Sequence, residues 1–396
     1  MSRTEWTEKD VAYILLTEGA EKKNWEDNGH VIPKTNTPII QTGLKTQLSQ
    51  LKLPFPVIPI KGLPDGNNEE EIWQIFTRVF EVIQEGDELY FDLTHGFRYL
   101  PMLTLVLGNY AKFLKNITIK SITYGNYESR DESTNEAPII DLQSLSELQD
   151  WTSGSSSFLM NGNITTLTSM CERDLTPLIK ESKGKNDNAR ILRNYMKAIA
   201  NLVDDLNTCR GEEILKGDNI RKINHLSNEL TDVIIEPMKP IIKKIRESFQ
   251  NFSTSDHIKN GYIAAQWCFD NKMYQQSLTI LNEMLISHIC EIEGWKKDDA
   301  TVRECVKSAF NKATNHDSCN KREYKDFNKE TINRIQSYKE FKTLVLIYDK
   351  TNDLRNDYNH SGMRPNGSSS QKIVNRLSDA LKLTQELLLE DSGFFK

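Results

Sequence analysis

The segment Asp92–Arg98 (Asp-Leu-Thr-His-Gly-Phe-Arg) carries side chains suited to binding an anion. Gly96 lets the backbone approach a ligand, and the first turn of a following helix offers free N–H groups to negative charge. Thr94 and His95 add hydrogen-bonding groups, and Arg98 adds a cation that matches the geometry of phosphate. The same residues also fit a helix N-cap with a structural glycine and a surface arginine, and spacing alone leaves both interpretations open.

A second group, Arg355-Asn356-Asp357-Tyr358-Asn359-His360, lies near the end of an expected helix that Ser361-Gly362 terminates. Histidine can move protons near neutral pH, and arginine can hold two phosphate oxygens. RNA supplies its own nucleophile, the 2′-hydroxyl, so these residue types could cleave it without a metal ion. The alternative is a solvated helix end on which Arg355 is a surface cation.

Helical geometry restricts how this second group can act. Arg355 and His360 lie about 140° apart around a helix, whereas Asn356 and His360 share a face. One straight helix therefore does not easily direct both Arg355 and His360 at one phosphate.

The first group requires a sheet to position it. Four short apolar or β-branched runs predict strands at Val11–Leu16, Val57–Lys61, Glu88–Leu93 and Ile117–Tyr124. Amphipathic stretches predict helices at Glu69–Gln84, which Gly86 closes, and at Pro101–Leu114. This alternation predicts a mostly parallel sheet covered on both faces. The loops Thr17-Glu18-Gly19, Asp92–Arg98 and Tyr124-Gly125-Asn126 would then lie on one edge and form a ligand site.

The second group belongs to a part of the chain that is expected to be helical. Residues 126–163 are polar and include the Ser/Gly run Thr152–Ser157, which predicts a linker. Beyond it, helical patterns extend over Ile164–Glu181, Asn188–Cys209, Ile220–Asn251, His257–Phe269, Tyr274–Glu293, Asp326–Asn356 and Gln371–Glu390.

Composition narrows the class of protein. A net charge of −6 argues against a general nucleic-acid coat protein but permits a local phosphate site. No apolar run approaches the roughly 20 residues of a membrane span, and the start has no signal-peptide core, so a cytoplasmic protein is expected. The six cysteines form no C-x-x-C pair and no zinc spacing, so no metal or other cofactor is expected.

The first part of the chain resembles a known family. LLTEGAEKKNWEDN, EEEIWQIFTRVFEVIQEGDELYFDLTHGFRYLPML and NYAKFLKNITIKSITYG resemble the CARF sensor domains of CRISPR-associated proteins, over most of residues 5–127. The resemblance implies a Rossmann-like α/β domain that binds cyclic oligoadenylate across a two-fold dimer axis. Cyclic tetra-adenylate is favoured, with cyclic hexa-adenylate as the alternative. The implied ligand contacts, on matching positions, are Thr94, His95, Gly96 and Arg98, with Thr17 and Glu18 nearby.

Members of that family usually begin with an additional strand and a Gly-containing ligand loop. This sequence starts just before what corresponds to their second strand. Either it is shortened at its amino end or its sheet lacks that element. The preferred ring size therefore stays open.

The second part resembles the HEPN ribonucleases. Arg355–His360 fits their R-x4–6-H signature, and YQQSLTILNEMLISHICEIE (274–293) resembles a helix of that family. The resemblance implies an all-α HEPN domain with Arg355, Asn356 and His360 as catalytic residues, acting from two protomers. Products would carry 2′,3′-cyclic phosphate and 5′-hydroxyl ends.

The combined prediction is a cyclic-oligoadenylate-activated, metal-independent endoribonuclease that cleaves single-stranded RNA in type III CRISPR antiviral defence. Residues 1–150 would be the sensor, 151–255 a helical connecting region and 256–396 the HEPN domain. The partners expected are RNA, the activator and a second copy of the chain, with higher oligomers left open. The alternatives are a cyclic-oligoadenylate-binding regulator without nuclease activity, or a sensor that also degrades its own activator.

Overall fold

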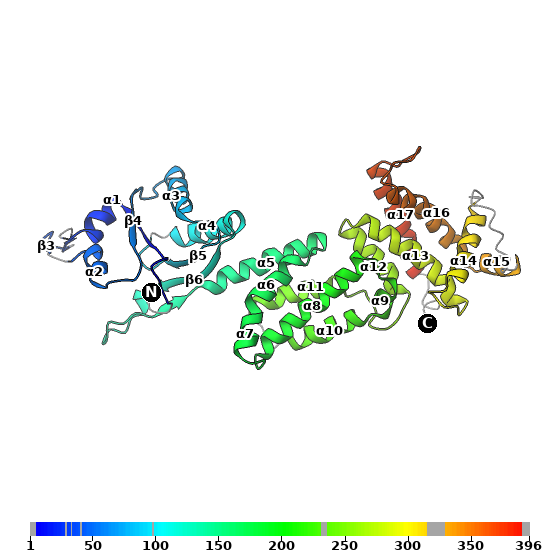
Figure 1. The fold of residues 1–396 in the computed structure, drawn as a ribbon, viewed down its shortest axis with the longest axis horizontal. Coiled ribbons are helices and arrows are strands. Elements are labelled where there is room, and N and C mark those ends of the chain that lie inside the picture. The colour runs from blue at the N-terminus through cyan, green and yellow to red at the C-terminus, as the bar shows by residue number, and fades with distance from the viewer. Residues whose placement is uncertain are drawn as a thin grey trace. The chain divides into compact units, whose positions relative to one another are not determined.

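The computed structural model describes residues 5–27, 30–32, 34–39, 42–96, 99–230, 236–314 and 329–389. The chain divides into two compact units, with the boundary between Ser146 and Glu147. Strands and helices alternate in the first unit, and the described residues of the second are helical (Figure 1). Among the described residues, no helix is both long enough and apolar enough to cross a bilayer.

The strands of the first unit form three small sheets. β1 (Ala12–Thr17) pairs in parallel with β4 (Val57–Leu63), and β5 (Glu88–Asp92) pairs in parallel with β6 (Thr118–Gly125). β7 (Ile139–Asp141) adds to β6 in antiparallel orientation, and β2 (His30–Val31) and β3 (Pro38–Ile39) form a short antiparallel pair. All four predicted strands are confirmed, with ends displaced by at most two residues.

The prediction of one sheet covered on both faces is wrong for the described residues. The β1–β4 pair and the β5–β6–β7 sheet are separate, with no strand pairing between them in this part of the chain. On one face the apolar side chains of Tyr13, Leu15, Ile58 and Tyr90 are about two-fifths exposed, and their neighbours along each strand are more buried. Apolar residues occur on both faces of these strands. For that reason the sequence pattern alone suggested that both faces of the sheet are covered.

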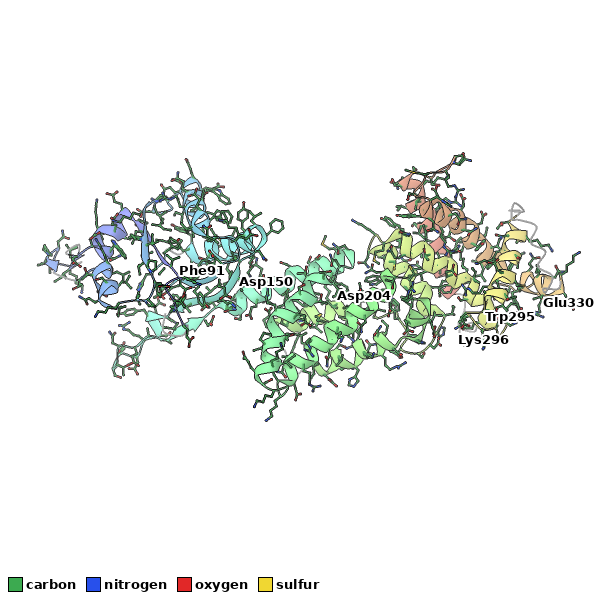
Figure 2. The ribbon with its side chains drawn as sticks, viewed as in Figure 1. Phe91, Asp150, Asp204, Trp295, Lys296 and Glu330 are labelled. Atoms are coloured by element: carbon green, nitrogen blue, oxygen red, sulfur yellow. The ribbon has the colours of Figure 1, made fainter. Side chains whose placement is uncertain are left out.

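Helices cover the other face of the first unit. Its helical segments are α1 (Glu18–Ala20), the π-helical turn η1 (Glu21–Trp25), α2 (Leu44–Gln50), α3 (Glu69–Val82), α4 (Leu100–Lys115) and the 3-10 turn η2 (Tyr127–Ser129). Asn68 caps α3 by accepting the N–H of Glu71 at 2.9 Å. Gly86 turns the chain towards β5 with a φ of 79°. Phe76 and Leu107 bury their side chains in the core against which Phe91 packs (Figure 2).

The predicted linker is wrong, because the Ser/Gly run Thr152–Ser157 lies inside helix α5 (Gln143–Asn161). Trp151 and Phe158, on either side of the run, are buried in the core of the second unit. Gly154 packs closely against Leu167, where a larger side chain would need space. Burial of these flanking aromatic residues outweighs the low helix propensity of serine and glycine.

The other helices of the second unit follow in sequence. They are α6 (Thr165–Met170), η3 (Cys171–Leu175), α7 (Thr176–Glu181), α8 (Asp187–Asn207), α9 (Gly211–Lys216), α10 (Asp218–Glu229), η5 (Glu236–Met238), α11 (Lys239–Glu247), α12 (Lys259–Asp270), α13 (Tyr274–Ile292), α14 (Ala300–Ala313), α15 (Lys329–Gln336), α16 (Phe341–Asn359) and α17 (Ser370–Leu389). Most of the predicted helices are present, but α9 and α14 were not predicted.

Two predicted long helices are interrupted. The stretch 220–251 contains α10 and α11, and α11 begins beside Pro237 and Pro240, which lack the N–H that a continuous helix needs. The stretch 326–356 contains α15 and α16, separated by residues 337–340, and Asp326 lies outside the described residues.

Residues on both sides of the predicted boundary at 255, such as Phe252 and Ile258, belong to one core. The subdivision at that boundary stays a prediction.

Helix α13 is the centre of this core. Buried residues occur around almost its whole circumference, which is typical of a helix enclosed by others. It contacts α12, α14, α16 and α17. Any buried polar side chain on α13 therefore needs a partner on a neighbouring helix.

Candidate functional site

The loop after β5 is fixed to the end of β6. The Thr94 hydroxyl accepts the N–H of Gly125 at 2.9 Å, and the Asp92 carboxylate accepts the N–H of Thr94 at 2.9 Å. A Cβ atom on Gly125 would lie 2.9 Å from the Thr94 methyl group, so the close approach requires glycine. Two of the three predicted loops therefore meet through side-chain to backbone contacts.

The ends of β1 and β4 connect to the same edge. Thr17 and Leu63 are partners in the register of these strands. The Tyr99 hydroxyl, just after the β5 loop, donates to the carbonyl oxygen of Asp65 at 3.1 Å. Contacts thus join β1 to β4, and the loop after β4 to the start of α4. Sequence reasoning missed the loop after β4, although the turn residues Pro64–Asn68 following that strand are a signal for it.

The predicted ligand contacts differ in how accessible they are. His95 and Gly96 are exposed, and Thr94 is half-buried. The Thr17 hydroxyl caps α1 by accepting the N–H of Ala20 at 3.2 Å. Glu18 is exposed and pairs with Lys22 at 2.5 Å, and this hydrogen bond lowers the pKa of Glu18. Arg98 lies outside the described residues.

Arg355 lies on α16 and points towards α13. Its guanidinium Nη2 is 2.9 Å from the Glu283 carboxylate, and its Nη1 donates to the Asn282 side-chain oxygen at 3.4 Å. About a quarter of the Arg355 side chain is exposed, while its Nε is buried with no hydrogen-bond partner in the described part of the chain. Asn282 is buried and donates to the Thr351 hydroxyl at 3.3 Å. Arg355 is thus a fixed cation rather than a freely solvated one.

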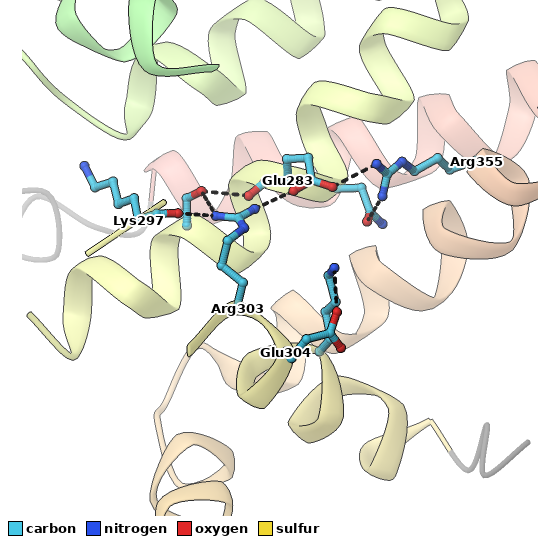
Figure 3. A network of polar contacts seen from close by, with 8 residues as sticks. Glu283, Lys297, Arg303, Glu304 and Arg355 are labelled. Atoms are coloured by element: carbon cyan, nitrogen blue, oxygen red, sulfur yellow. Dashed lines mark hydrogen bonds and ion pairs between the residues drawn. The ribbon is translucent and has the colours of Figure 1, made fainter. Parts of the chain in front are cut away.

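Glu283 forms ion pairs with two arginines (Figure 3). One carboxylate oxygen contacts Arg355, and the other contacts Arg303 of α14. Arg303 also donates to the Ser287 hydroxyl at 3.0 Å and to the carbonyl oxygen of Lys297 at 2.7 Å. One carboxylate between two guanidinium groups leaves a net positive charge in this cluster, which suits the recruitment of an anion.

Asn356 and His360 face away from this cluster. Both are exposed, whereas Arg355 contacts α13, in agreement with the angular separation expected on one helix. His360 follows the last residue of α16, and Ser361 and Gly362 take positive φ values of 53° and 70° that end the helix. Asp357 is buried and accepts the N–H of Ser368 at 2.7 Å, so it anchors the turn after α16.

A polar cavity of about 400 Å³ adjoins Arg355. It is bounded by the turn after α8, the first turns of α13 and the end of α16. Arg355 and Asn359, one turn apart on α16, line it, and His360 follows directly in the chain. The structure therefore brings Arg355 and Asn359 together on the cavity wall, while it does not bring Arg355 and His360 of one chain to a common point.

Another buried polar pair, Tyr262 and His288, has a structural role. The Tyr262 hydroxyl lies 2.6 Å from Nδ1 of His288, and both side chains are buried. Burial lowers the pKa of His288 to about 4, so the ring is neutral at pH 7.

Sequence reasoning missed Glu283 and Arg303. The signal available was the pair Asn282-Glu283 in the middle of an otherwise apolar helix, because enclosed polar groups need partners. The partner Arg303 lies on α14, a helix that the sequence pattern did not reveal. Identifying the cluster therefore required the tertiary arrangement of α13, α14 and α16.

Parts of the chain are similar to known proteins. Residues 11–128 match the family model of the CARF domain of CRISPR system endoribonuclease Csx1. The chain is also 27% identical over 230 residues to CRISPR-associated protein MJ1674 of Methanocaldococcus jannaschii, a match that covers 57% of this chain and 33% of that protein. The match thus spans about a third of the length of the relative.

The chain therefore consists of an α/β unit followed by a helical unit, and in α/β units ligands commonly bind at the carboxyl ends of strands. Residues 11–128 are similar to a CARF domain, and the chain is similar to a CRISPR-associated protein.

Proposed function

We propose that the chain is a cytoplasmic ribonuclease of type III CRISPR defence that cyclic oligoadenylate activates and that cleaves single-stranded RNA. The observation that carries this proposal is Arg355, a cation fixed by Glu283 beside a polar cavity, five residues from an exposed histidine. The second unit would act as a HEPN nuclease. The matched CARF domain supplies the sensing half of the proposal.

The chemistry needs only proton transfer and charge stabilisation. His360 would move protons to or from the 2′-hydroxyl and the leaving 5′-oxygen, because histidine is the side chain most often used for proton transfer in catalysis. Arg355 would stabilise the negative charge that grows on the pentacoordinate phosphate. Asn356 shares an exposed helix face with His360 and could orient it or the RNA. The products would be a 2′,3′-cyclic phosphate and a 5′-hydroxyl.

Two protomers would complete one active site. Arg355 on α16 contacts α13, whereas His360 follows the last residue of α16 and is exposed, so each phosphate would meet groups from two copies of this helix end. Helix α4 supports pairing, because Met102, Val106, Tyr110 and Phe113 form an exposed apolar stripe on it, and Phe113 is 86% exposed. This stripe begins directly after the β5 loop, so a second copy packed there would lie next to the ligand edge.

The activator would bind at the joined strand ends. Thr94, His95 and Gly96 would contact the phosphates or sugars of the ring, with Arg98, Thr17 and Glu18 nearby. We favour cyclic tetra-adenylate, with cyclic hexa-adenylate as the alternative. Ring binding would favour one arrangement of the paired nuclease units over others and so assemble the composite site.

The test is RNA cleavage by the purified full chain. Labelled single-stranded RNA would be incubated with protein alone, or with cyclic tri-, tetra- or hexa-adenylate, in the presence and absence of EDTA. We expect cleavage that depends on one ring size and is unchanged by the chelator. Absence of cleavage with every ring, although the protein binds one of them, would contradict the nuclease assignment.

That outcome would favour the second candidate, a cyclic-oligoadenylate-binding regulator without nuclease activity. The specific observation in its favour is that Glu283 already occupies one side of the Arg355 guanidinium. Loss of the bound ring during incubation, measured by chromatography, would instead indicate a sensor that degrades its own activator.

A further inference from the structure

The cavity beside Arg355 has a second arginine on its wall. Arg210, in the turn between α8 and α9, lines the same space as Arg355, and its Nε and Nη2 donate to the carbonyl oxygen of Thr208 at 2.8 and 2.6 Å. These bonds fix the orientation of the Arg210 guanidinium. Two fixed guanidinium groups on one cavity form a site for an anion.

Cys209 lines the same cavity as Arg210 and Arg355. Its thiol lies on the cavity wall, where burial raises its pKa while the charges of Arg210 and Arg355 lower it. Cys209 adopts a positive φ of 54°, because it closes α8 through the bond from the Arg210 N–H to the Asp205 carbonyl oxygen at 2.8 Å. This turn therefore places Arg210 and Cys209 opposite α16.

The rest of the lining is amide and hydroxyl in character. Gln275 and Gln276 of α13 and Asn359 of α16 contribute side chains that both donate and accept hydrogen bonds. No carboxylate belongs to the described residues that line the cavity, so a metal cation is disfavoured. The space is open to solvent on one side. Amides can hydrogen-bond to base edges and to a 2′-hydroxyl, and arginine binds phosphate.

We propose that this cavity holds one nucleotide of the single-stranded RNA substrate, with a phosphate between Arg210 and Arg355 and its base or ribose against the side-chain amides. The identity of the ligand as RNA rests on the proposed function. Arg355 would then bind the phosphate of the nucleotide in the cavity. Asn359 would contact this nucleotide, and His360 would transfer protons at the neighbouring one. Arg210 would be a binding residue for RNA that the R-x4-H motif does not include.

Direct binding tests the role of Arg210 without cleavage. Fluorescent single-stranded RNA would be titrated into full-length His360→Ala protein, with cyclic tetra-adenylate present, and followed by anisotropy. Adding Arg210→Ala should weaken binding about tenfold, as expected for loss of a hydrogen bond to a charged group. Arg190→Ala is the matched control, because Arg190 is an exposed arginine on α8 that pairs with Asp187 away from the cavity. Equal affinity for the Arg210 variant and its parent would overturn the proposal.

Alkylation of Cys209 reports on occupancy of the cavity. Among the described cysteines, Cys209 is the half-buried one and the others are buried. With cyclic tetra-adenylate present, saturating RNA should slow the modification of Cys209 by N-ethylmaleimide at least about threefold, measured by peptide mass spectrometry. An unchanged rate with RNA bound, or protection by cyclic tetra-adenylate alone with no further effect of RNA, would overturn the proposal.

The two proposals fail in different ways. If the wild-type chain does not cleave RNA but Cys209 is protected and Arg210→Ala weakens binding, the nuclease assignment fails and the nucleotide site stands. RNA cleavage could also occur although Arg210→Ala does not weaken RNA binding and RNA does not slow the alkylation of Cys209. In that case the nucleotide site fails and the nuclease assignment stands.

Discussion

The two candidate sites of this chain are built in different ways. In the first unit the site residues lie where strands end, and contacts such as Thr94 to Gly125 join one loop to the next. In the second unit the site depends on charged side chains from three helices, with Glu283 shared between Arg303 and Arg355. The first site is positioned mainly by topology, whereas the second is positioned by a cluster in which each member depends on the others.

This difference predicts different responses to substitution. A change at the strand ends should alter one loop and its ligand contacts. A change in the charged cluster should affect Arg355 even when the substituted residue lies on another helix, because it leaves a partly buried charge without its partner.

The largest expected effect is a loss of RNA cleavage at the second site that leaves ligand binding at the first site unchanged. His360→Ala should reduce RNA cleavage about a thousandfold, the scale of general acid–base catalysis, because the imidazole would transfer protons in the reaction. Since His360 is exposed, this substitution should leave the thermal unfolding temperature and activator binding unchanged. Cleavage rates with labelled RNA and calorimetric titration with cyclic tetra-adenylate measure both properties.

Retention of cleavage near the wild-type rate, in protein free of contaminating nuclease, would remove His360 from the active site. Mixing provides a further check on the shared site. Excess His360→Ala protein added to wild type, with subunit exchange verified, should suppress activity more than dilution predicts. Activity that follows only the amount of wild-type protein would return the site to a single chain.

A smaller effect should come from Glu283, which does not belong to the R-x4-H motif. Glu283→Gln keeps the size of the side chain but removes the charge that orients Arg355, so cleavage should fall about a hundredfold, as for a misplaced catalytic group. Glu304→Gln is the matched control, because Glu304 lies next to Arg303 in the chain and pairs with Lys307 (Figure 3). It should retain nearly full activity.

A double-mutant cycle distinguishes positioning from a general loss of structure. If Glu283 acts through Arg355, cleavage by the double variant Glu283→Gln/Arg355→Ala should equal that of Arg355→Ala alone. Full additivity of the two losses, with unfolding temperatures that fall in parallel, would show that Glu283 only stabilises the fold.

The sequence predicted more of the first site than of the second. The four strands and the loops after β1, β5 and β6 follow from local apolar runs and the glycines after them, and all four strands are confirmed. The four predicted strands lie in two separate sheets. This separation was not predicted, because strand pairing depends on residues distant in sequence. The exposed apolar face was missed for a related reason, since side chains such as Tyr13 and Leu15 look the same whether covered or not.

In the second unit, local pattern identified helices but not their partners. Arg355 and His360 were named from their spacing, yet Glu283 and Arg303 emerged only from the packing of α13 against α14 and α16. The Ser/Gly run in α5 was instead predicted as a linker although it is helical. There, burial of Trp151 and Phe158 stabilises a helix that local composition argues against.

The smallest expected effects compare two neighbouring residues of the strand-end site. Thr94→Val keeps the shape of the side chain but leaves the Gly125 N–H without its acceptor, which should lower the stability of the first unit by about 1 kcal/mol and weaken activator binding as well. His95→Ala removes an exposed side chain, so stability should change by less than about 0.5 kcal/mol while activator affinity falls about tenfold. Thermal unfolding and calorimetric titration with cyclic tetra-adenylate measure the two quantities, with Lys9→Ala as an exposed control in the same unit. Unchanged affinity in both Thr94→Val and His95→Ala would exclude the β5 loop from the ligand site. Equal losses of stability would instead show that His95 supports the loop, and the first site would then share the interdependence seen around Glu283.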